Sequence, residues 1–145
     1  MLREWRALCP ELRALWDDSE AVTEWEGVTF NEAGGADVGR VVKIWLFRKG
    51  LTGDVPAALG RLTALTALGL HLNQLTSVPA ELGRLTALTV LDLRGNQLTR
   101  VPEKLGELTA LKSLRLDGNQ LTSVPAEWKR GGALEQSGCD IHIGR

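Results

Sequence analysis

Hydrophobic residues recur at fixed positions through most of this chain of 145 residues. Three segments align without a gap and give the pattern a period of 23 residues: 59–81, 82–104 and 105–127. In the first copy, Leu68 and Leu70 alternate with small or polar residues, which predicts a short strand whose leucines point inward. Pro79 has no backbone N–H to donate and a fixed φ, so it ends the extended stretch and favours a short helical segment.

One copy alone cannot bury its leucines, whereas stacked copies share a continuous core. A further copy at residues 41–58 precedes the three and carries one added residue, which we place at Gly53. Its Ile44 and Leu46 occupy the positions of the two strand leucines. The sequence therefore predicts four successive coils, and their shared interior accounts for a leucine content of 26 residues.

The period, the leucines at fixed offsets and an asparagine after each strand resemble the leucine-rich-repeat family. The segment LTGDVP at residues 51–56 is similar to the plant-type subclass of that family. The resemblance implies an α/β solenoid, a right-handed coil with a short parallel β-sheet on its concave face and an N-terminal helical cap. We expect a structural ladder of amides bonding the backbone of neighbouring coils, formed by Asn73, Asn96 and Asn119.

Residues 1–38 form the predicted N-terminal capping segment. Spacings of three and four indicate an apolar helical face made of Leu2, Trp5, Leu8, Leu12 and Leu15. Pro10 divides this face into two short helices. The WEGVT sequence that follows resembles the strand of the capping module in plant receptor-type leucine-rich-repeat proteins. In that family a disulfide-forming cysteine commonly comes next, and this chain has Phe30 instead.

Residues 128–145 are expected to form a partial coil that closes the core, with Trp128 in the column of Leu82 and Leu105. The repeat offset places four further residues, Leu134, Ser137, Cys139 and His142, on the columns of Leu111, Leu114, Leu116 and Asn119. The capping segment, the repeats at 39–127 and this partial coil are predicted to form one structural domain.

Charge and hydropathy exclude several classes of partner. The net charge is −1, and no dense basic stripe with interleaved aromatics is present, so we expect no nucleic-acid binding. The N-terminus lacks the apolar region of a secretory signal, and polar residues interrupt the uncharged run at 62–80, so no membrane span is predicted. Because the chain begins with Met1 and has a cap at each end, we expect it to be self-contained.

Cysteine usage favours a reducing compartment. About five coils separate Cys9 from Cys139, which is too far for one disulfide. The apolar Phe30 in place of a capping cysteine points the same way. We therefore expect reduced thiols and a cytoplasmic location.

The sequence does not favour an enzyme, and we expect neither a metal nor a cofactor. His71 and His142 lie on different coils, and the glycines of 34–39 lack the lysine of a phosphate-binding loop. Cys139, Asp140 and His142 resemble a fragment of a metal site, but zinc usually takes three or four ligands and no second cluster is present. Cys139 is better explained as a packed thiol.

The candidate site is the concave face, because variation between the copies falls mainly on outward strand positions. The predicted partner-binding residues are Lys43, Trp45, Phe47, His71, Asp92, Arg94, Arg115 and Asp117. Asp92 beside Arg115, and Arg94 beside Asp117, predict crossed charge pairs between strands, which either neutralise each other or leave a charge for a partner. Trp45 and Phe47 either anchor a contact or pack beneath the N-terminal cap, and the sequence leaves both open.

The resemblance implies a non-catalytic interaction module that presents a concave sheet to a protein or peptide. One alternative is a sensor or regulatory part of a larger signalling or immune-receptor protein. Another is a structural repeat protein that associates with itself. We expect a monomer, and repeat modules of this fold serve too many functions for the sequence to name the partner.

Overall fold

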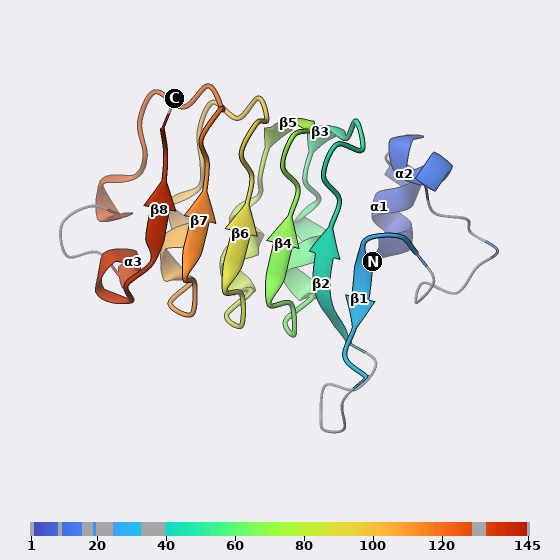
Figure 1. The fold of residues 1–145 in the computed structure, drawn as a ribbon, viewed down its shortest axis with the longest axis horizontal. Helices are drawn as coiled ribbons and strands as arrows, with labels where there is room; N and C mark the ends of the chain where they lie inside the picture. The colour runs from blue at the N-terminus through green and yellow to red at the C-terminus, as the bar shows by residue number, and fades with distance from the viewer. Residues whose placement is uncertain are drawn as a thin grey trace.

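A computed structural model of the chain describes residues 2–8, 10–15, 19, 25–32, 40–128 and 133–144. The chain winds into a solenoid whose strands lie side by side along one face (Figure 1). The six strands of this sheet are, in spatial order, β1 (Val28–Phe30), β2 (Val41–Trp45), β4 (Ala67–Gly69), β6 (Val90–Asp92), β7 (Ser113–Arg115) and β8 (Asp140–His142). The predicted fold class, a leucine-rich-repeat α/β solenoid, is confirmed.

Strands from successive coils pair in parallel and in equivalent register. Ile44 pairs with Leu68, Leu68 with Leu91, and Leu91 with Leu114. Each inward leucine therefore lies beside its counterpart in the next coil, which is the arrangement that the 23-residue period requires. A second, two-stranded sheet of β3 (Thr52–Asp54) and β5 (Gln74–Ser77) lies on the flank. Its register shifts between Gly53 and Asp54, where the first coil carries its added residue.

Short 3₁₀ helices form the side of the coil opposite the main sheet. They are η2 (Ala57–Arg61), η3 (Ala80–Arg84), η4 (Glu103–Glu107) and η5 (Ala126–Trp128). Pro79 lies directly before η3 with an extended backbone, and its carbonyl accepts the Leu82 N–H at 3.2 Å. The predicted helical segments are thus 3₁₀ helices of three to five residues, the short pieces in which this helix usually occurs.

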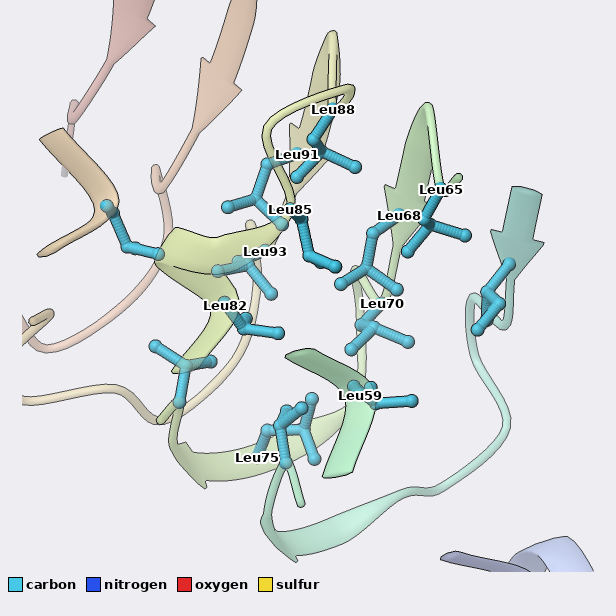
Figure 2. Close-up of a cluster of buried hydrophobic side chains, with 14 of the residues drawn as sticks. Leu59, Leu65, Leu68, Leu70, Leu75, Leu82, Leu85, Leu88, Leu91 and Leu93 are labelled. Atoms are coloured by element: carbon cyan, nitrogen blue, oxygen red, sulfur yellow. The ribbon is translucent and has the colours of Figure 1, made fainter. Parts of the chain in front are cut away.

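Leucines from strands, turns and 3₁₀ helices fill the interior (Figure 2). The leucines of adjacent coils point toward one another, and Leu59, Leu68 and Leu82 are fully buried. Because each coil contributes the same set of side chains, the core is a continuous column along the solenoid.

The three predicted ladder asparagines connect neighbouring coils. The Asn96 amide nitrogen donates to the Leu70 and Leu93 carbonyls, both at 3.0 Å, and its oxygen accepts the Leu75 N–H at 3.0 Å. Asn73 makes equivalent bonds to the first coil, including one from the backbone N–H of Lys49. These side chains therefore satisfy backbone groups that the turn would otherwise leave unpaired.

The N-terminal segment covers the first end of the core with two helices, α1 (Leu2–Leu8) and α2 (Pro10–Leu15). Pro10 is the first residue of α2, as the sequence predicts. Trp5 and Leu12 are buried in the core. β1 follows and pairs antiparallel to β2, and Phe30 at its end is partly buried against the core. Cys9 lies outside the described residues.

The last coil departs from the predicted alignment. A helical turn, α3 (Ala133–Gln136), lies before β8, and Leu114 pairs with Ile141 rather than with Ser137. His142 consequently stands beside Arg115 on the sheet, not in the asparagine column. The offset prediction was wrong because the additional turn lengthens this coil; Trp128 and Leu134 are buried as the leucine pattern predicts, and the partly buried Ile141 takes the place beside Leu114.

Candidate binding face

Strand pairing assembles the predicted site residues on one face. Lys43 pairs with Ala67, Trp45 with Gly69, and Gly69 in turn with Asp92. Further along the same row, Asp92 pairs with Arg115. Four more residues, Phe47, His71, Arg94 and Asp117, come just after the strands, where the backbone N–H of one coil bonds a carbonyl of the next.

Trp45 and Phe47 are exposed on this face and so are not packed beneath the N-terminal cap, while their role as a contact anchor stays a prediction. Their exposed fractions are 41% and 45%. The Trp45 ring lies across Gly69, which has no Cβ; a Cβ at that position would be only 2.5 Å from the ring. Phe47 stacks on the His71 ring with centroids 5.2 Å apart and planes 6° apart, and Trp45 meets the same ring edge-on at 5.7 Å.

His71 lies buried beneath the two aromatic rings. Its Nδ1 is 3.5 Å from Asp92 Oδ2 and has no hydrogen-bond partner among the described residues. Burial lowers the pKa of His71, and the Arg94 and Arg115 charges lower it further, while Asp92 opposes them. The imidazole is therefore neutral at pH 7 and supports the rings as a packed heterocycle.

The acidic and basic residues of the face are paired along the strands. Arg94 Nε lies 3.3 Å from Asp92 Oδ2, and Arg115 Nε lies 3.9 Å from Asp117 Oδ1. Asp92 is nearly fully buried, so Arg94 neutralises a carboxylate that water does not reach. The prediction of crossed pairs was wrong: Asp92 does stand beside Arg115, but the guanidinium groups turn toward acids two residues away on their own coil.

Sequence reasoning missed Leu72 as a candidate site residue. Leu72 is 48% exposed, with a left-handed φ of 58°. Arg48 holds the same position in the first coil with a φ of 54°, while Gly95 and Gly118 hold it in the third and fourth coils. The glycine column was a usable signal, because two non-glycine residues in it stand out once the copies are aligned.

We use the name apolar platform for Trp45, Phe47 and Leu72, the large apolar side chains exposed on this face. Lys43 and Arg48 are exposed at its borders and make no ion pair with any described residue. The platform is thus bordered by two cations that make no ion pair with a described residue.

The described residues contain no group of three His, Cys, Asp or Glu side chains placed to hold a metal ion. Asp140 and His142 form an exposed pair at 2.9 Å on the last strand. Cys139 is a free thiol, and burial raises its pKa, as expected of a packed side chain. Within the described part of the chain, no helix is long and apolar enough to cross a membrane.

Comparison with known proteins agrees with this architecture. A family model described as leucine rich repeat matches residues 63–121. The receptor protein kinase WSS1 of Oryza sativa subsp. japonica is 45% identical over 69 residues, which are 48% of this chain and 7% of the kinase. This chain thus corresponds to a small part of that relative.

Two solved structures from Arabidopsis thaliana are similar over most of the chain. The BIR2 ectodomain gives a TM-score of 0.70 at 30% identity and covers 83% of this chain, which spans 66% of that ectodomain. The ectodomain of the membrane receptor kinase GASSHO1/SCHENGEN3, in complex with CASPARIAN STRIP INTEGRITY FACTOR 2, gives 0.75 at 31% identity and covers 92% of this chain and 15% of its own. Residues 63–121 thus match the leucine-rich-repeat family. Over most of its length the chain is similar in fold to plant receptor ectodomains.

Proposed function

We propose that the chain is a non-catalytic interaction module that binds a protein or peptide through the first three coils of its concave face. The observation that carries this proposal is the apolar platform, three large side chains left exposed on or just after the strands of the first two coils. Full burial of each would contribute about 1.5–3 kcal/mol, so together they could supply much of the affinity of a contact. The GASSHO1/SCHENGEN3 ectodomain, solved with its bound factor, supports a binding role for this fold.

Quantitative affinity capture tests the proposal. The wild type is compared with a Trp45→Ala/Phe47→Ala variant and with Arg100→Gln, a control on an exposed side chain away from the platform. We expect proteins that the wild type and the control retain and the double variant loses. Equal recovery by all three proteins, with circular dichroism showing intact folds, would remove the concave face from consideration.

A second candidate is a sensor or regulatory part of a larger signalling protein. The similarity to a rice receptor protein kinase over 69 residues favours it. Sequencing of full-length transcripts tests this candidate, which requires a reading frame that joins these repeats to a further domain.

We also propose that the protein works in a reducing compartment such as the cytoplasm, as a monomer. Cys139 is free, and Phe30 packs where a disulfide cysteine stands in the resembling caps. The location of a fluorescent fusion tests the compartment, and light scattering tests the monomer. Fluorescence in the secretory pathway or outside the cell would contradict the first point, and a dimer at low concentration would contradict the second.

A further inference from the structure

The left-handed column of Arg48, Leu72, Gly95 and Gly118 carries information about the partner. Glycine adopts this conformation at no steric cost, whereas an arginine or leucine is strained in it. Leu72 is about half exposed although it packs over Gly95, and Arg48 makes no ion pair with a described residue, so much of each side chain is available to a partner. We therefore include both side chains in the candidate contact surface.

These two residues directly follow Phe47 and His71 along the chain. The Arg48 N–H bonds the His71 carbonyl at 3.2 Å, which holds the Arg48 backbone beside that of His71, whose ring stacks on Phe47. Leu72 lies across Gly95, where a Cβ would be 2.7 Å from its methyl group. Trp45 lies across Gly69 in the same way, so both large side chains lean over a glycine of the following coil.

Lys43 and Arg48 make no ion pair with a described residue, whereas the acids of this face are paired. Asp92 and Asp117 are each paired with an arginine, and Glu26 is paired with Lys49. Lys43 precedes Trp45 by two residues and Arg48 directly follows Phe47, so the two unpaired cations lie on either side of the aromatic pair along the first coil. Complementary charge steers partners and discriminates among them.

We propose, as a refinement of the function above, that the platform binds a protein segment in which acidic side chains flank a large apolar one. The apolar side chain covers Trp45, Phe47 and Leu72, and the carboxylates lie against Lys43 and Arg48. We take a peptide as the occupant, because the two cations lie on either side of the aromatic pair along one coil and so suit a single segment that alternates acidic and apolar side chains.

Selection from a random displayed peptide library against the full chain tests this inference. We expect the selected peptides to carry Asp or Glu beside Phe, Trp or Leu, and to bind more weakly as salt rises. Trp45→Ala should weaken the best peptide at least about thirtyfold and Arg48→Gly about threefold, with Arg100→Gln unchanged. Arg48→Gly should also raise the unfolding midpoint, because it relieves strain, so lost binding cannot be ascribed to lost folding.

The other outcomes separate the two proposals. Peptides that need Trp45 but carry no acids would overturn the acidic partner and leave the interaction surface standing. Peptides indifferent to both substitutions, or a failure to select any, would overturn both. Co-sedimentation with phosphatidylserine vesicles that is lost in Trp45→Ala/Phe47→Ala would replace the peptide by a membrane.

Discussion

Replacement of Asn96 by alanine measures how strongly the asparagine ladder holds the coils together. The change removes the acceptor of the buried Leu75 N–H, which costs about 1–3 kcal/mol when no other partner is available. It also removes donors to the Leu70 and Leu93 carbonyls, but these keep bonds from the asparagines of neighbouring coils, so the added loss is smaller. The sum is about 3 kcal/mol.

Asn119 provides the matched comparison, because it makes the same kinds of bond but is only partly buried. Water can replace part of what Asn119→Ala removes, so we expect about 1 kcal/mol. With a urea dependence of about 2 kcal/mol per molar, the unfolding midpoint should fall by about 1.5 M for Asn96→Ala and about 0.5 M for Asn119→Ala. Asn96→Asp keeps the acceptor but sets a buried carboxylate against two carbonyls, and should be no more stable than Asn96→Ala at pH 7.

Urea unfolding followed by circular dichroism gives all three midpoints under one condition. Equal effects of the two alanine variants, or a loss below about 1 kcal/mol for Asn96→Ala, would refute the reasoning that burial of the ladder sets its strength.

Other substitutions test the face and the core. Gly69→Ala should displace the Trp45 ring, because the added Cβ would clash with it. We expect a changed near-ultraviolet circular dichroism spectrum and weaker partner binding, with little change in the urea midpoint. An unchanged aromatic spectrum would contradict the contact. Because the pKa of His71 in the folded protein is lowered from 6.5, His71 of the unfolded chain binds a proton first as the pH falls. The free energy of unfolding should therefore decline below about pH 6.5, and His71→Gln should remove that part of the decline. Trp128→Ala should cost about 3–5 kcal/mol in urea unfolding, since the buried indole closes the core, and a loss under about 1 kcal/mol would show that it does not. Arg48→Gly should raise stability by about 0.5–1 kcal/mol, and a lower midpoint would mean that the arginine supports the fold.

The repeat made most of the fold predictable from the sequence. Each leucine column corresponds to one position of a coil, so the sequence alone aligns Leu68, Leu91 and Leu114. The three residues do pair in the sheet. Pro79 likewise marked the start of a 3₁₀ turn, because its ring restricts the backbone whatever surrounds it.

The last coil was not predictable in the same way. Its leucines give way to mixed residues, so no column fixed the register, and the helical turn at α3 moved Ile141 into the place assigned to Ser137. A register derived from a period holds only while the period continues.

The site was predictable in position but not in detail. Outward strand positions follow from alternation, which brought Asp92 beside Arg115 as expected. Which acid each flexible guanidinium group approaches depends on burial and on side-chain geometry that a sequence does not state. The same holds for the Trp45 ring, whose exposure depends on the space above Gly69.

The equivalent register of successive coils separates the length of the protein from its recognition surface. Among the described residues, the contacts of the apolar platform reach the third coil, where Leu72 lies over Gly95 and its N–H bonds the Arg94 carbonyl. Since residues 105–127 begin and end at the same point of the repeat as their neighbours, duplication of that segment by unequal recombination would join compatible ends. A gene lengthened in this way would encode additional coils and additional surface, while the apolar platform on the first coils stayed unchanged.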